Sequence, residues 1–391
     1  MRRRRVGRLF ASALVAVALS LGLSPETASA QTPPVTLDAS AKAITIGGDV
    51  KLTVQIDPPQ GGETVSIRDA GGTEIASGQT GSRGRFAATF SPKENVTLHA
   101  EWGAEVSADV PIGVRARVRV RLGAVRLFDT VVARGGVAPI VPGARVDVVL
   151  THAGKVLFEH HPRMGTAGGF RTRFDVPLPG TYRVRARYDD AEHLAGSDTG
   201  GPRTTPLPTL RRGSRGRSVK LLEQRLVALH YRLVGVNESF DFRTADAVMA
   251  FRKVQRMPRT QTVDAAVWRA LASPVRLHPH ARTDGFHIEV DQTRQVLFTV
   301  VDGRVRAIIH VSTGKPSTPT RDGSFRVSRK LAGYSEHGLY YPSYFDGNRA
   351  IHGWPDVPSY AASHGCVRVP YWHAKWIFGL ADIGTRVLVY H

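Results

Sequence analysis

The chain has 391 residues, which is long enough for several domains of ordinary size. With 42% hydrophobic and 22% charged residues, its composition is that of a globular protein and excludes an intrinsically disordered one. The formal net charge of +20 is spread along the chain, and because no nucleic-acid-binding motif accompanies it, the charge alone identifies no partner.

The first thirty residues predict an export signal. Arg2 to Arg5 with Arg8 form a positive segment, residues 10–23 form an apolar run, and Ala28-Ser29-Ala30 resembles a cleavage site. The apolar run is short for a membrane span, so we expect an exported chain without a transmembrane segment after cleavage; a retained signal anchor is the alternative. On an exported protein, basic charge suits anionic wall polymers or lipid head groups, and nucleic acid is not expected.

Residues 33–202 predict short strands and turns. Lys51–Ile56 and Arg115–Arg121 alternate in polarity, as strands with one exposed face do. The region also repeats itself: Gly84–Phe90 is echoed by Gly168–Phe174, where the two phenylalanine pairs share an offset of 84 residues. We therefore predict two β-sandwich modules of immunoglobulin-like character, at 33–114 and 115–202, acting as spacers.

A linker rich in Gly, Pro, Ser and Thr at 196–208 precedes a change to helical spacing. Apolar residues recur every three or four positions, which predicts a bundle of three short helices at 207–273. Ser218, Thr244 and Asp264 are the expected N-caps of these helices.

The bundle resembles the peptidoglycan-binding domain that lies N-terminal to the catalytic domain of many wall enzymes. The resemblance rests on Leu210-x-x-Gly213-x-x-Gly216-x-x-Val219-x-x-Leu222, on Phe240, on Thr244-x-x-Ala247-Val248-x-x-Phe251, and on Val263-Asp264 with Trp268-x-x-Leu271. Three residues depart from the family pattern: Asp241 stands where Gly is common, and Glu223 and Arg252 stand where Gln is common. The resemblance implies a domain that binds peptidoglycan.

Residues 285–391 return to strand patterns. Phe286, Ile288 and Val290 alternate, residues 295–301 are mostly apolar, and Asp302-Gly303 predicts a hairpin turn into a partner strand at 304–311. A last strand is expected at 386–390. The chain as a whole is therefore predicted to be multidomain and mainly β.

Chemistry-bearing residues concentrate in Ile351-His352-Gly353 and Ser363-His364-Gly365-Cys366-Val367-Arg368. Cys366 is the single cysteine of the chain, so it has no disulfide partner. A thiolate is a strong nucleophile, and a nearby imidazole can produce it. Backbone N–H groups around Gly365 and Cys366 could meet an oxyanion, which acyl transfer requires.

These two segments resemble the L,D-transpeptidase catalytic domain of the YkuD type. The similarity extends over 285–391 and includes Ser312-Thr313-Gly314-Lys315, Pro319-Thr320-x-x-Gly323-x-Phe325 and Gly384-Thr385-x-Val387. It implies a β-sandwich or barrel-like domain that needs no metal or organic cofactor. Its cysteine takes an acyl group from a tetrapeptide stem, releases D-Ala and passes the acyl group to an amine on a second stem.

Carried over to this chain, the resemblance makes Cys366 the nucleophile and His352 the base, whose imidazole the Gly353 carbonyl orients. It further implies that Ser363, His364 and Gly365 shape the pocket and oxyanion hole, that Arg368 supports the site or meets a substrate carboxylate, and that carbapenem-type β-lactams inhibit the enzyme. Tyr341 is a candidate wall of the substrate cleft, although a place in the aromatic core fits its position equally well.

Three alternatives remain open at this stage. The two histidines and the cysteine are zinc-ligand types, but their spacing is not that of ordinary zinc motifs. Water as acceptor would make the same site an L,D-carboxypeptidase. A protein that binds the wall without catalysis is the third alternative.

Overall fold

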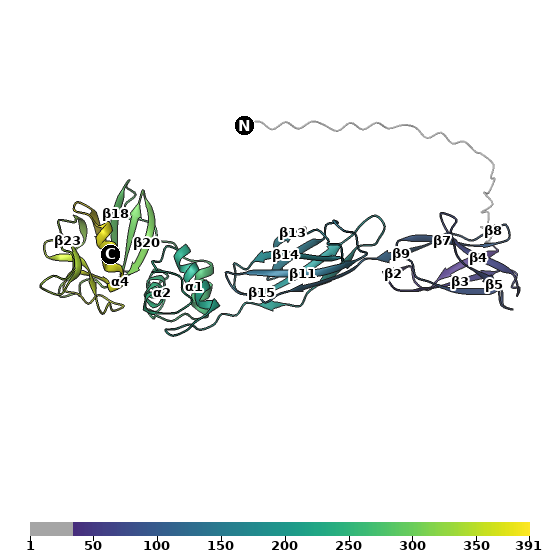
Figure 1. The fold of residues 1–391 in the computed structure, drawn as a ribbon, viewed down its shortest axis with the longest axis horizontal. Helices are drawn as coiled ribbons and strands as arrows, with labels where there is room; N and C mark the ends of the chain where they lie inside the picture. The colour runs from purple at the N-terminus through teal and green to yellow at the C-terminus, as the bar shows by residue number, and fades with distance from the viewer. Residues whose placement is uncertain (1–33) are drawn as a thin grey trace, which may run out of the picture. The chain divides into compact units, whose positions relative to one another are not determined.

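The computed structural model describes residues 34–391 (Figure 1). The predicted export signal lies outside the described residues. The described chain is mainly β, as predicted, with four helices among residues 34–391. It divides into two compact units: the first holds residues 34–42, 49–91 and 96–112, and the second holds residues 43–48, 92–95 and 113–391. In the part of the chain that the structure describes, no helix has the length and apolar character needed to cross a membrane.

The first β-rich region builds two sheets from alternating buried and exposed residues. One sheet has the order β1-β3-β6 and the other contains β9-β7-β4-β5. Buried side chains such as Leu52 and Leu98 come from both sheets and form the core between them. The strands are β1 (Val35–Ala39), β2 (Ala43–Thr45), β3 (Val50–Ile56), β4 (Thr64–Asp69), β5 (Glu74–Gln79), β6 (Arg85–Phe90), β7 (Val96–Trp102), β8 (Glu105–Val106) and β9 (Val110–Arg115).

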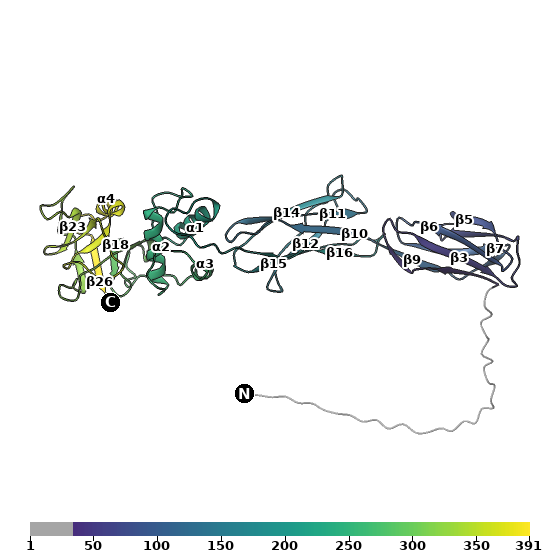
Figure 2. The same cartoon turned by 90° about the horizontal axis from the view of Figure 1, so that it is seen from below.

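The second β-rich region repeats this topology with the sheets β10-β11-β14 and β13-β12-β15-β16 (Figure 2). The repeat seen in the sequence falls on equivalent strands, because Gly84–Phe90 supplies β6 and Gly168–Phe174 supplies most of β14. The predicted strand Arg115–Arg121 is interrupted at Ala116, whose N–H bonds to Leu194. The strands are β10 (Arg117–Leu122), β11 (Thr130–Ala138), β12 (Asp147–His152), β13 (Lys155–His160), β14 (Gly169–Asp175), β15 (Thr181–Tyr188), β16 (Gly196–Thr199) and β17 (Arg203–Thr204).

Three helices follow: α1 (Arg217–Ala228), α2 (Phe242–Val254) and α3 (Ala265–Ala272). The predicted cap at Asp264 is confirmed, since its carboxylate accepts from the Val267 N–H at 2.9 Å. The predicted caps at Ser218 and Thr244 are wrong. Helix α1 begins after Gly216 without a side-chain cap, and Asp241 caps α2, because its carboxylate reaches the free N–H groups of the first turn better than a residue already inside the helix.

The three departures from the peptidoglycan-binding pattern all serve the interior of the bundle. Asp241 is the cap of α2. The buried carboxylate of Glu223 accepts from two backbone N–H groups and from the Thr244 hydroxyl at 2.7–3.0 Å. The buried guanidinium of Arg252 donates to Asp264 and to two carbonyls. Each substitution therefore brings its own hydrogen-bond partners, which a buried polar group requires.

The C-terminal region packs two sheets and one helix around a core. One sheet has the order β20-β19-β18-β26-β21 and the other β22-β23-β24-β25, and α4 lies against β23 and β24. The predicted Asp302-Gly303 hairpin joins β19 to β20. The elements are β18 (Phe286–Asp291), β19 (Val296–Val301), β20 (Arg304–His310), β21 (Gly323–Arg326), β22 (Arg329–Lys330), β23 (Tyr340–Asp346), β24 (Arg349–Trp354), β25 (Val367–Pro370), α4 (Tyr371–Leu380) and β26 (Arg386–Tyr390).

The mostly apolar sequence of β19 has a direct structural cause: both of its faces are buried. Leu297 joins the core between the two C-terminal sheets. Val296, Phe298 and Val300 join the core of the three-helix bundle, which covers the other face. The bundle and the C-terminal sheet therefore share one hydrophobic core.

Candidate functional site

The two segments that carry the candidate chemistry lie side by side as strands. Strand β24 carries His352, and β25 runs parallel to it with Ile351 opposite Val367 and His352 opposite Arg368. Cys366 directly precedes β25, and its Sγ atom accepts a hydrogen bond from the Ala350 N–H at 3.4 Å. Paired residues and those two positions away share a face. The structure thus brings Cys366, His352 and Arg368 to one face of these strands.

The Cys366 thiol is half-buried at the start of β25. Its Sγ lies 3.9 Å from the Asn348 carbonyl oxygen, and among residues 34–391 no hydrogen bond joins it to the His352 imidazole. Burial raises the pKa of the thiol above its ordinary value, while the Ala350 N–H and the charges of Arg368 and Arg349 oppose this rise. The resting group is therefore a thiol, and attack requires a base.

His352 is suited to accept that proton. The residue is 2% exposed, and Nδ1 lies 3.0 Å from the Gly353 carbonyl oxygen. A carbonyl only accepts, so Nδ1 carries the hydrogen and Nε2 is left with its lone pair. Burial lowers the pKa of His352 to about 4, against the opposing effect of the Gly353 carbonyl. The imidazole is therefore neutral at physiological pH, with an unprotonated Nε2.

Gly353 and Gly365 are needed for different reasons. A Cβ atom on Gly353 would lie 2.7 Å from the Ala374 Cβ in α4, so this glycine permits close packing of helix on strand. Gly365 has φ +107°, a conformation that L side chains rarely adopt, and a Cβ there would lie 2.8 Å from Arg349 Nε. The Gly365 turn sets the direction in which the chain enters Cys366.

The Ser363 hydroxyl stabilises this turn through two hydrogen bonds. The Gly365 N–H donates to Ser363 Oγ at 3.1 Å, and Ser363 Oγ donates to the Cys366 carbonyl at 2.5 Å. The Gly365 N–H, expected as an oxyanion donor, is thus already engaged in this structure. The Cys366 N–H has no recorded partner among the described residues.

Thr320 is a residue that the sequence analysis placed only in a motif. Its hydroxyl donates to the Gly365 carbonyl at 3.0 Å and accepts from the Gly314 N–H at 2.9 Å. The neighbouring Thr318 hydroxyl donates to the Ser363 carbonyl at 3.1 Å. The Pro319-Thr320 motif in the sequence pointed to this residue, but the motif alone did not reveal which backbone atoms the hydroxyl contacts.

Arg368 faces the site without a carboxylate partner. Within residues 34–391 no Asp or Glu oxygen lies within 4.0 Å of it, and its guanidinium carbon sits 4.9 Å from the ring centroid of Trp354. Burial lowers the pKa of Arg368, and the Cys366 thiol lies close enough to counter part of that effect. The guanidinium is thus free to meet an anion beside the thiol.

The remaining candidates, His364 and Tyr341, contact other groups. The exposed His364 has its Nε2 3.3 Å from Lys315 Nζ. Tyr341 packs edge-on against Tyr340 and Phe378 at centroid distances of 4.8 and 5.1 Å, which places it in an aromatic cluster on the core. Among the described residues no group of three or more His, Cys, Asp or Glu side chains has the arrangement of a metal site.

Comparison with known proteins identifies two regions. The model of the L,D-transpeptidase catalytic domain matches residues 285–389, and that of the putative peptidoglycan binding domain matches residues 215–271, in the middle of the chain and directly before the catalytic domain. No curated protein sequence matches this chain.

Two solved structures illustrate the similarity. An L,D-transpeptidase from Xylanimonas cellulosilytica is 34% identical, with 47% of this chain and 99% of that chain covered and a TM-score of 0.45. The catalytic domain of the E. faecium L,D-transpeptidase, solved acylated by ertapenem, is 29% identical, with 28% of this chain and 100% of that chain covered and a TM-score of 0.24. The two-sheet domain at the C-terminal end of this chain, with its Ser-His-Gly-Cys-Val-Arg segment, belongs to the L,D-transpeptidase catalytic domain family.

Proposed function

We propose that this protein is an exported peptidoglycan L,D-transpeptidase that works by cysteine acyl transfer. The observation that carries the proposal is the pairing of β24 and β25, which puts a buried neutral imidazole on the same face as the single cysteine of the chain. Family membership of residues 285–389 supports the reaction class. The substrate is a tetrapeptide stem, and the products are a cross-linked stem and D-Ala.

In the first half-reaction, His352 Nε2 takes the thiol proton as Cys366 Sγ attacks the carbonyl carbon that precedes the terminal D-Ala. A C–S bond forms, and the carbonyl oxygen becomes an oxyanion that the Cys366 N–H can stabilise. When the oxyanion collapses, the C–N bond breaks and the D-Ala amine leaves with the proton held by His352. A thioester on Cys366 remains, and His352 is again neutral.

In the second half-reaction, the amine of another stem attacks the thioester. His352 removes a proton from that amine, a new amide bond forms and the C–S bond breaks. The thiol regains the proton from the imidazolium, so the enzyme returns to its starting state with no net change. Arg368, which has no carboxylate partner among the described residues, is positioned to hold a stem carboxylate during both steps.

The helical domain would bind peptidoglycan and so keep the catalytic site close to its substrate. The match of residues 215–271 to a peptidoglycan binding domain supports this role. Because the bundle shares its core with the catalytic sheet, the helical domain would hold the catalytic site at a fixed position relative to the bound wall.

Incubation of purified protein with disaccharide-tetrapeptide, followed by mass spectrometry of the products, tests the proposal. A cross-linked dimer plus free D-Ala is expected, and Cys366→Ser should form neither product, because a hydroxyl is not activated in a site built for a thiol. A disaccharide-tripeptide without dimer would identify a carboxypeptidase. No turnover by the unaltered protein would favour a wall-binding protein without catalysis.

A further inference from the structure

The positive charge of the chain is not evenly spread, contrary to the first impression from the sequence. The two β-rich regions share one topology. Residues 34–114 contain 6 lysines and arginines and 10 aspartates and glutamates. Residues 115–202 contain 14 lysines and arginines and 8 aspartates and glutamates. A general enrichment of arginine in the whole protein would give both β-rich regions a similar net charge. The second region therefore carries a specific basic feature.

That feature lies on the outer face of one sheet. Arg121 on β10 pairs with Arg134 on β11, which in turn pairs with Arg171 on β14. Neighbouring strands are about 4.8 Å apart, so three arginines form one row across the sheet. Two more, Arg119 and Arg173, lie on the same face two positions along their strands. We call the following exposed residues the arginine face: Arg119, Arg121, Arg134, Arg171 and Arg173.

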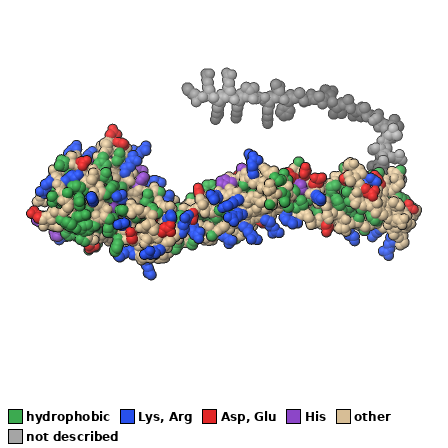
Figure 3. All heavy atoms as spheres, in the orientation of Figure 1, with side chains coloured by type: hydrophobic (Ala, Val, Ile, Leu, Met, Phe, Trp, Pro, Cys, Tyr) green, Lys and Arg blue, Asp and Glu red, His purple; other side chains and the backbone are tan. Residues whose placement is uncertain are grey.

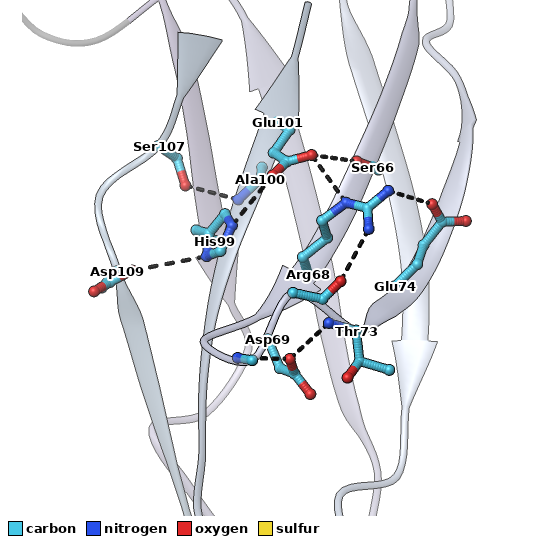
Figure 4. Close-up of polar contacts among 12 residues, drawn as sticks. Ser66, Arg68, Asp69, Thr73, Glu74, His99, Ala100, Glu101, Ser107 and Asp109 are labelled. Atoms are coloured by element: carbon cyan, nitrogen blue, oxygen red, sulfur yellow. Dashed lines mark hydrogen bonds and ion pairs between the residues drawn. The ribbon is translucent and has the colours of Figure 1, made fainter. Parts of the chain in front are cut away.

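The members of the arginine face have no charge partners. Within the described residues, none has a carboxylate oxygen within 4.0 Å, and none makes a recorded side-chain hydrogen bond. In the first region, by contrast, Arg68 lies between Glu101 and Glu74 at 2.9 and 3.0 Å (Figure 4). In the view of Figure 3, lysine and arginine side chains are more frequent over the second region than over the first.

This arrangement works against the stability of the sheet, because like charges directly opposite each other repel. The arginine row is bordered by Gly136 and Gly169, which pair with each other and leave a trough beside it. Arg119, Arg121 and Arg134 also line an open groove of about 870 Å³, to which Asp198 contributes the one carboxylate. Asp175 lies at the far end of the face, two residue pairs beyond Arg173.

We propose that the arginine face binds a linear polymer other than a nucleic acid that carries phosphate groups along its length. Guanidinium groups match phosphate oxygens in pairs, and a row of three across the strands suits an extended chain of anions. Strands β10, β11 and β14 expose no large hydrophobic side chain, which a surface inserting into a membrane would use. The absence of exposed aromatic side chains on these strands also removes the stacking platform of single-stranded nucleic acid binders.

The test compares two variants of the full chain with equal loss of charge. One replaces the row (Arg121→Gln, Arg134→Gln, Arg171→Gln), and the matched control replaces the outward arginines of β15 on the opposite sheet (Arg183→Gln, Arg185→Gln, Arg187→Gln). Binding to inorganic polyphosphate, to single-stranded DNA and to vesicles of phosphatidylglycerol is measured over a range of salt concentrations.

The unaltered protein should bind polyphosphate more tightly than DNA or vesicles. The row variant should lose about tenfold or more in affinity, and the slope of log affinity against log salt should fall by about 2, as three lost contacts predict. The row variant should keep the enzymatic turnover of the unaltered protein. Its melting temperature should not fall, because the substitutions remove charges that repel one another. Equal losses in both variants, or preferential binding to vesicles or DNA, would overturn the proposal.

Discussion

Arg259, in the loop after helix α2, donates a hydrogen bond from Nη1 to the carbonyl oxygen of Ser359 at 2.9 Å. Ser359 lies in the segment that joins His352 to Cys366. The other arm of the guanidinium, Nη2, donates to the Thr293 carbonyl, also at 2.9 Å. A residue of the helical domain therefore holds the connection between the two proposed catalytic residues.

A buried chain of hydrogen bonds makes a second connection to the same segment. Lys253 Nζ of α2 contacts the carbonyls of Gln295 and Val311 at 2.9 Å and His310 Nδ1 at 2.6 Å. His310 Nε2 in turn lies 2.8 Å from the Val357 carbonyl. With Nδ1 accepting from the lysine, Nε2 carries the hydrogen that Val357 receives.

The Arg259 contact is expected to matter for activity more than for stability. Arg259→Gln should lower kcat/KM several-fold, because a small displacement of catalytic groups is costly, while the exposed carbonyls regain water. Arg256→Gln, an equal change at an exposed residue of the same loop without a recorded side-chain bond, should leave kcat/KM unchanged. Steady-state kinetics and thermal melts of both variants measure this. Equal kinetics in the two variants would contradict the positioning role.

Lys253→Met should destabilise the unit formed by the bundle and the catalytic domain. The change leaves two carbonyls and an imidazole nitrogen buried without a donor, at a cost of about 3 kcal/mol. The melting temperature should fall clearly, whereas Lys155→Met, at an exposed lysine without recorded bonds, should leave it near that of the unaltered protein. Calorimetry can follow both. An unchanged melting temperature for Lys253→Met would show that the buried bonds contribute little.

The pH dependence of acylation should report the low pKa of His352. Below its pKa the imidazole is protonated and cannot accept the thiol proton. Since burial lowers this pKa to about 4, kcat/KM should stay level as the pH falls from 7 to about 5 and decline only near pH 4. The charge of Arg368 also lowers the pKa, so Arg368→Gln should move the acidic decline to higher pH. A decline centred near pH 6.5 in the unaltered protein would indicate a solvated base.

Gly365→Ala should impair the site. The side chain would be strained at φ +107° and would meet Arg349 Nε, so the turn before Cys366 must shift. We expect at least about a hundredfold loss of kcat/KM, since an alignment error of this size is costly. Gly379→Ala in α4, where the added Cβ meets nothing within 4 Å, is the control and should retain activity. Normal kinetics for Gly365→Ala would mean that the turn does not set the thiol position.

A carbapenem should acylate Cys366. Its strained amide carbonyl would be attacked by Sγ with His352 as base, and the ring C–N bond would break to leave a stable thioester. Intact-mass spectrometry should show one adduct per chain, at the single cysteine. Reaction with a small thiol reagent but not with a carbapenem would show an accessible thiol in a site not built for acyl transfer.

His352→Ala should slow acylation by about a hundredfold or more, and His373→Ala should not.

The sequence by itself determined most of the local structure. Alternation placed the strands, Asp302-Gly303 placed a hairpin, and the Ser-His-Gly-Cys-Val-Arg segment with His352-Gly353 identified the family, because these signals depend on residues close together in the chain. The helix starts at Ser218 and Thr244 were misjudged, since several polar residues compete for each cap and only the backbone geometry selects among them.

Only the tertiary structure decided how distant residues meet. The apolar run of β19 did not reveal that the helical bundle covers its second face. The brace from Thr320 to Gly365, and the contact from Arg259 to Ser359, join residues 45 and 100 positions apart, and no local pattern records such pairs. Local propensity acts over a few residues, whereas burial and hydrogen bonding across the core depend on the complete packing of the chain.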